Sequence, residues 1–131
     1  MAESLMDISK ARYLPSDIIA AILGLLGCEN FTGKTEKIQT TIATLRKHHP
    51  ILQEFAFSTN GVYPFSRELE NSLSVLQCSR LLRMENPDFN VYVVKHTAKE
   101  YIRSNVLPRF KPDELLELHE IARKFEEVCG L

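Results

Sequence analysis

The stretch that most constrains the fold runs from residue 63 to residue 94, where a helical pattern gives way to a strand pattern. Three leucines recur at the spacing of one helical face: Leu69, Leu73 and Leu76. They predict an amphipathic helix over about Arg67 to Ser79. Ser66 is well placed to cap its start, because a serine oxygen can accept a hydrogen bond from a free amide of the first turn.

The residues after this helix predict a β-hairpin. Two apolar runs, 81–85 and 89–94, flank an Asn-Pro-Asp sequence at 86–88, which is typical of a turn. The second run is rich in Val and Tyr, residues that favour strands. We therefore expect two strands joined at 86–88.

Two further helices are expected before this segment. The first begins at Ser16 as N-cap, is apolar on almost every side and ends at Gly27. The second begins at Thr32 or Thr35 and stops at Pro50. Between it and the third helix, residues 51–63 predict a short strand pair or loop with positive φ at Asn60-Gly61.

Three short helices followed by a hairpin are the order of a winged helix-turn-helix domain, so the expected class is α+β and mostly helical. Two more helices are predicted, one from Thr97 to about Pro108 and one from Pro112 to Cys129. The expected organisation is an N-terminal arm over 1–15, the winged-helix domain over 16–107 and a C-terminal helix over 108–131.

The C-terminal helix has a wide apolar face and an acidic outer side. A face of this width can pack on its own domain or form a two-fold dimer interface, and the sequence leaves both open.

The sequence lacks the motifs of secretion, metal binding and nucleotide binding, so we expect a non-enzymatic protein of the cytoplasm. The start of the chain does not have the pattern of a signal peptide, and three widely spaced cysteines do not form a disulfide framework or a metal motif. Five residues separate Gly27 from Gly33-Lys34-Thr35, one more than a phosphate-binding P-loop has. We therefore expect no cofactor, no metal site and no catalytic residues.

Three segments resemble a known family. They are DIIAAILGLL, FTGKTEKIQTTIATLRKH and VYPFSRELENSLSVLQCSRLL. Together they resemble the YwgA-like winged-helix proteins of prokaryotes and are more distantly similar to Panacea-type antitoxin domains. The resemblance covers about residues 16–107 and implies a winged-helix fold with a regulatory or antitoxin-like role. The residues that carry it are Gly33, Lys34, Thr35, Gln39, Ser66, Arg67, Glu68 and Leu69.

The third helix is the candidate surface for a partner. Its predicted outer side carries Arg67, Asn71 and Ser74, which can hydrogen-bond base edges in a DNA groove. Four cations are candidates for contacts to DNA phosphates: Lys34, Lys37, Arg80 and Arg83.

Charge keeps a second hypothesis open. The net charge is −1, and Glu68 and Glu70 lie on the same helix, whereas a dedicated DNA-binding protein is more often basic. The sequence therefore predicts either a double-stranded DNA-binding regulator or a protein-interaction adaptor built on the same scaffold, with a homodimer possible in each case.

Overall fold

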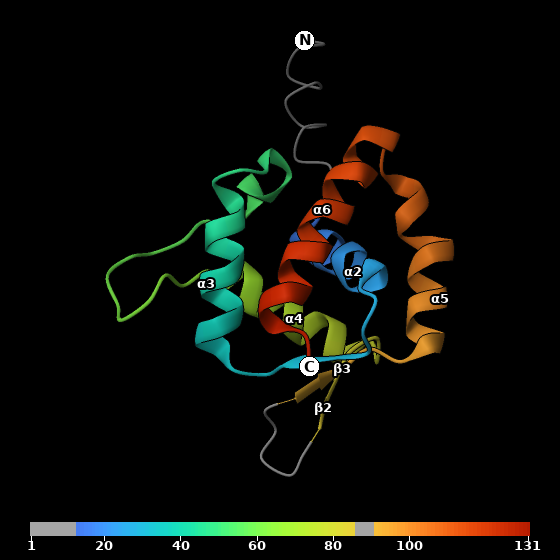
Figure 1. Ribbon diagram of the computed structural model, residues 1–131, viewed down its shortest axis with the longest axis horizontal. Coiled ribbons are helices and arrows are strands. Elements are labelled where there is room, and N and C mark those ends of the chain that lie inside the picture. Colours follow the sequence, from blue (N-terminus) through green and yellow to red (C-terminus); the bar gives the residue numbers. More distant parts are fainter. Residues whose placement is uncertain (1–12, 86–90) are drawn as a thin grey trace.

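A computed structural model describes residues 13–85 and 91–131, which form a bundle of helices above one small sheet (Figure 1). The α-helices of this part of the chain are α2 (Pro15–Leu25), α3 (Thr35–Arg46), α4 (Arg67–Cys78), α5 (His96–Asn105) and α6 (Pro112–Cys129). The strands are β1 (Asn30–Thr32), β2 (Arg83–Glu85) and β3 (Val91–Val93), with 3-10 helices η1 (Pro50–Glu54) and η2 (Leu107–Arg109). The predicted mostly helical α+β class is confirmed.

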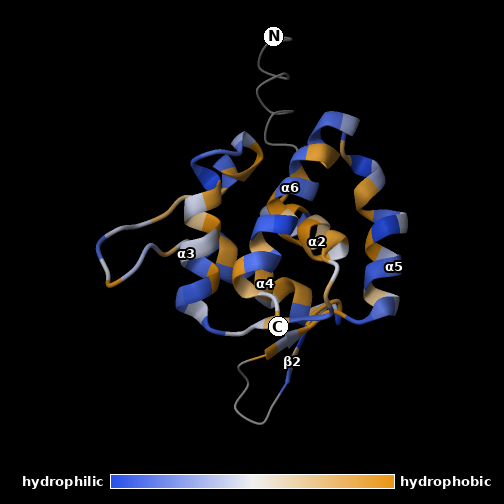
Figure 2. Ribbon diagram, viewed as in Figure 1, coloured by the Kyte–Doolittle hydropathy of each residue, from blue (hydrophilic) through white to orange (hydrophobic). Residues whose placement is uncertain are grey.

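Helix α2 lies at the centre of the molecule, as its all-round apolar sequence predicts. Residues 18–24 are all buried, and α2 packs against α4, α5 and α6. In Figure 2 it is the apolar helix enclosed by helices whose outer sides are hydrophilic. A helix without a polar side is stable only inside a core, so α2 fixes where the outer helices can lie.

The end of α2 is held by a buried lysine. Lys99 of α5 is 7% exposed, and its Nζ donates hydrogen bonds to the carbonyl oxygens of Leu26, at 2.9 Å, and Cys28, at 2.7 Å. An ammonium group suits the negative end of a helix and satisfies carbonyl groups that have no partner within the helix. Lys99 therefore links α5 to α2 through polar bonds as well as packing.

The three strands form an antiparallel sheet in the order β1-β3-β2. Tyr92 of β3 is opposite Phe31 of β1 and Met84 of β2, and the Phe31 and Tyr92 rings stack with centroids 5.2 Å apart. The predicted hairpin strands are confirmed, although they are shorter than 81–85 and 89–94. The predicted turn at 86–88 lies outside the described residues.

Strand β1 was not predicted. Thr32, one of the two residues expected to begin the second helix, ends this strand, and α3 begins at Thr35. Only three residues pair, and a strand this short has too little alternation to be distinguished from a loop.

The predicted Ser16 cap and the predicted positive φ at Asn60-Gly61 were wrong. Ser16 does not cap α2; the helix begins one residue earlier, at Pro15, whose fixed φ suits a first helical position. Of the two alternatives left open for residues 51–63, the structure shows the loop: η1 is followed by a loop closed by one bridge between Ser58 and Phe65. Arg80, and not Asn60 or Gly61, has positive φ among the described residues.

Helix α6 packs on its own domain. Leu118, Ile121 and Phe125 are buried in the same core as α2, and Leu131 N donates to Asn30 O at 3.1 Å, alongside β1. Of the predicted arm, residues 1–12 lie outside the described residues, while Tyr13 stacks on Phe110 at 4.3 Å. The face proposed for a dimer is thus largely used within one chain.

The close approach of α2 and α5 generates a stability prediction. A Cβ at Gly24 would lie 2.5 Å from Ile102 Cγ2, and Ile102 is fully buried. We expect Gly24→Ala to lower the free energy of unfolding by about 1–3 kcal/mol, because the core must shift to admit the methyl group. Urea unfolding measures the change.

The matched control is Gly61→Ala, where the nearest atom to the added Cβ is 3.9 Å away. This variant should stay within about 0.5 kcal/mol of the original protein. Equal stability of the two variants would contradict the close contact between α2 and α5.

Candidate nucleic-acid interface

Helix α4 has one side in the core and one side in solvent, as predicted. Leu69, Leu73 and Leu76 are at most 5% exposed, and the Ser66 Oγ accepts a hydrogen bond from the Leu69 amide at 3.2 Å. The predicted base-reading residues are all exposed on the outer side of the helix: Arg67, Asn71 and Ser74. Their spacing places them in a single row along it.

A buried amide holds the start of α4 against α3. Gln39 of α3 is 0% exposed; its Oε1 accepts from Ser66 N at 2.8 Å, and its Nε2 donates to Ser66 O at 3.2 Å. The same Nε2 lies 3.1 Å from the Glu70 carboxylate. The amide thus satisfies both backbone groups of the residue that caps α4, which positions the outer row of side chains.

Two acidic groups near the start of α4 are engaged by the fold. Hydrogen bonds from its own backbone amide and from the Ser66 hydroxyl lower the pKa of Glu68, whose Oε1 also accepts from Ala56 N at 3.3 Å. Glu70 is bound to Gln39. These carboxylates therefore satisfy local donors, while Arg67 stays exposed. They also offset the positive end of the helix dipole, so the first turn of α4 itself attracts an anion only weakly.

The other two arginines of this region lie beyond the end of α4. Arg80 ends the helix with φ 66°, a left-handed conformation, and Leu81 N donates back to Leu76 O at 3.0 Å. Glycine usually occupies this position. The Arg80 side chain is exposed and makes no hydrogen bond or ion pair within the described residues. Arg83 on the edge strand β2 pairs with Glu85 at 3.2 Å, so its charge is partly neutralised.

The structure does not place Lys34 and Lys37 with the outer row of α4. Both lie near the start of α3 and line a recess of about 670 Å³ with Val128 of α6 and Tyr63. On α3, Lys37 is two residues before Gln39, which puts it on nearly the opposite side from the contact with α4. Tyr63 also lines a recess beside Arg67, so it lies between the two groups of cations.

The histidines and cysteines do not gather. His49 pairs with Glu117 at 3.4 Å and His96 with Glu100 at 2.9 Å, and the part of the chain that the structure describes contains no cluster of three potential metal ligands. Cys129 is buried, which raises the pKa of its thiol, while Cys78 is exposed on α4. No helix within 13–85 or 91–131 has the length and hydrophobicity needed to cross a bilayer.

Sequence reasoning found the outer row of α4 but missed the groups that position it. The Gln39–Ser66 link joins residues far apart in the chain, and the only signal for it was a lone glutamine next to the apolar Ile38 of the predicted second helix. The left-handed Arg80 gave no signal at all, because sequence reasoning expects glycine there.

Comparisons of the chain with protein-family models, with curated proteins and with solved structures each returned no match. The family resemblance drawn from residues 16–107 therefore stays a prediction.

The Gln39 contacts predict a large loss of stability on Gln39→Leu. The substitution keeps the size of the side chain but leaves the buried Ser66 amide without a partner, at about 1–3 kcal/mol for an unsatisfied group, whereas the Ser66 carbonyl still accepts from Glu70 N at 3.2 Å. We expect a decrease of about 1–3 kcal/mol in the free energy of unfolding in urea. Gln53→Leu is the control, because Gln53 bonds only to an exposed carbonyl, that of Arg46; equal losses for both would refute the role of Gln39.

The left-handed backbone of Arg80 predicts a substitution that raises the free energy of unfolding. Arg80→Gly relieves the left-handed conformation and should raise the free energy of unfolding by about 1 kcal/mol. Arg80→Ala keeps a Cβ, and so the strain, and should give no gain. Thermal unfolding of the two variants separates these outcomes, and equal melting temperatures would count against strain at this position.

Proposed function

We propose that this chain is a winged helix-turn-helix regulator that binds double-stranded DNA through α4 and the β2–β3 hairpin. The observation that carries the proposal is the exposed row of Arg67, Asn71 and Ser74 on a helix whose opposite side is anchored in the core. A helix held in this way can enter a major groove without breaking the contacts that anchor it in the core.

The chemistry of the row suits base edges. An arginine can bind guanine through two hydrogen bonds and an asparagine can bind adenine in the same manner, while serine adapts to either. Arg80, whose side chain makes no hydrogen bond or ion pair with a described residue, and Arg83 on the hairpin would contact phosphates on the flank. Lys34 and Lys37 would contact phosphates only if the DNA reached around Tyr63 to the recess at the start of α3.

The order of elements supports the proposed fold. Helix, strand, two helices and two strands follow one another, with β1 pairing beside the hairpin strand β3. The connection between α3 and α4, residues 47–66, is much longer than the turn of about three or four residues in a compact helix-turn-helix. In this proposal the Gln39–Ser66 link replaces the short turn in fixing the two helices. The family resemblance adds a regulatory or antitoxin-like role.

An adaptor that binds another protein is the second candidate. The loop before α4 exposes 96% of Val62 and 37% of Phe65, and exposed apolar groups of this kind favour protein contacts. Under this hypothesis Val62→Asp would abolish capture of a partner and Arg67→Gln would leave it intact.

The salt dependence of binding to a mixed-sequence duplex tests the DNA proposal by fluorescence anisotropy. Each phosphate contact should make log affinity fall by about 0.9 per tenfold rise in salt. Arg83→Gln should reduce that slope by about one contact. Arg67→Gln should cost about 1–3 kcal/mol of binding to the preferred sequence, because it removes a base contact.

Arg123→Gln provides the control, since Arg123 is an exposed arginine on α6. This substitution should change neither the salt dependence of DNA affinity nor the affinity itself. Failure to bind duplex DNA at about 50 mM salt, or an equal effect of Arg67→Gln and Arg123→Gln, would reject DNA binding by α4.

A further inference from the structure

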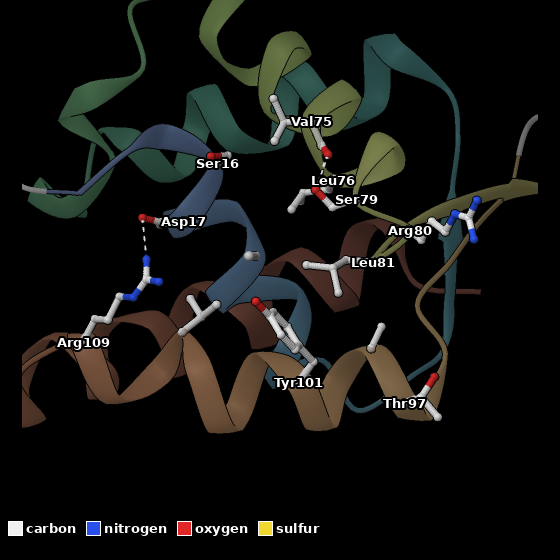
Figure 3. A pocket seen from close by; sticks show the side chains of 13 residues that line it. Ser16, Asp17, Val75, Leu76, Ser79, Arg80, Leu81, Thr97, Tyr101 and Arg109 are labelled. Carbon is white, nitrogen blue, oxygen red and sulfur yellow. Dashed lines mark hydrogen bonds and ion pairs between the residues drawn. The ribbon is translucent and has the colours of Figure 1, made fainter.

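We propose that the groove between α2, α4 and α5 is a binding site for a small amphipathic carboxylic acid. The groove has a volume of about 520 Å³ and is lined by the first turn of α2, the last turn of α4 and one side of α5 (Figure 3). It is separate from the outer row of α4, and this inference does not depend on DNA binding.

Apolar side chains form much of the floor and walls of the groove, and Ser16, Ser79 and Thr97 also line it. Ala20 of α2 and Ala98 of α5 are small, which leaves the space between the helices unfilled. Leu81 lines the middle, and Val75 and Tyr101 form opposite walls that are 47% and 52% exposed. Two large exposed apolar side chains that face one groove are suited to cover the apolar body of a ligand.

One end of the groove carries the charge that would bind a carboxylate. Arg109 of η2 donates from Nη1 to Asp17 Oδ2 of α2 at 3.1 Å, and its other guanidinium N–H groups make no hydrogen bond with any described residue. The Arg109 side chain is 55% exposed. Its open donors can bind a carboxylate as a planar fork, while Tyr101, which points from α5 toward α2, lines the groove farther from this end (Figure 3).

The shape of the groove favours a small molecule over a peptide helix. The Asp17–Arg109 ion pair joins α2 to η2 across one end, so a continuous helix could not run through it (Figure 3). The volume falls within the range of about 300–1,000 Å³ that is usual for small-ligand sites. Arg80 lines the other end, but its guanidinium points outward, so Arg109 is the cation that a bound acid would contact.

Titration with octanoate, monitored by amide chemical shifts of the intact protein, tests the proposal. Octanoate should shift residues of the groove and bind about tenfold more tightly than 1-octanol, because only the acid makes a charge-assisted hydrogen bond. Octylamine should bind more weakly than either. Failure of octanoate to shift groove residues, or equal affinities for the acid and the amine, would overturn the proposal.

Two substitutions at the charged end should act in opposite directions. Arg109→Gln should weaken octanoate binding about tenfold and leave 1-octanol unchanged. Asp17→Asn should tighten octanoate binding, because it removes the carboxylate that competes for Arg109. A merely structural role for this ion pair would make both variants weaken binding, and that result would refute the site.

Further variants separate the groove from the rest of the surface. Arg103→Gln, at an exposed arginine of α5 that does not line the groove, should leave octanoate binding unchanged. Val75→Glu places a negative charge on the exposed wall and should abolish octanoate binding without disturbing the core. Retained binding in Val75→Glu, or loss in Arg103→Gln, would place octanoate elsewhere and reject the proposal.

Discussion

The fold depends on the burial of one short helix. Residues 18–24 of α2 have no exposed side, so α4, α5 and α6 must together supply a complete apolar environment. The hydrophobic gain is large, at about 25 cal/mol for each Å² removed from water, and it is available only when all three helices are in place. Gly24 and Lys99 make the arrangement specific: one allows α5 to approach closely, and the other satisfies the carbonyl groups at the end of α2.

The surface of α4 follows from this core. Its leucines pack inward with α2, and the Gln39 amide fixes its first residue against α3, so that the remaining side must face solvent. A row of polar side chains on such a helix is pre-organised, because neither the backbone nor the anchoring contacts need to change when a partner binds. The same core leaves the groove beside α5 open, since Ala20 and Ala98 lack the side-chain volume to fill it.

Sequence reasoning predicted the features that repeat along the chain and missed those that depend on distant contacts. The leucine spacing of α4 and the apolar α2 were found because a helical face recurs every three or four residues. Strand β1 and the Gln39–Ser66 link are single, long-range pairings with no period. Of the candidate site, the row on α4 was predicted correctly as exposed, whereas the separation of Lys37 from that row required knowledge of which side of α3 faces α4.

The loop that separates α3 from α4 has a practical consequence. The Gln39 amide, and not the length of the connection, sets the geometry between these helices. The exposed segment around Asn60 to Val62 can therefore change in length without moving α3 relative to α4. An inserted epitope or a fluorescent reporter at this tip should leave the domain intact, since exposed loop tips are where proteins best accept insertions. The molecule thus offers a handle for labelling that lies next to the start of α4 and outside the core.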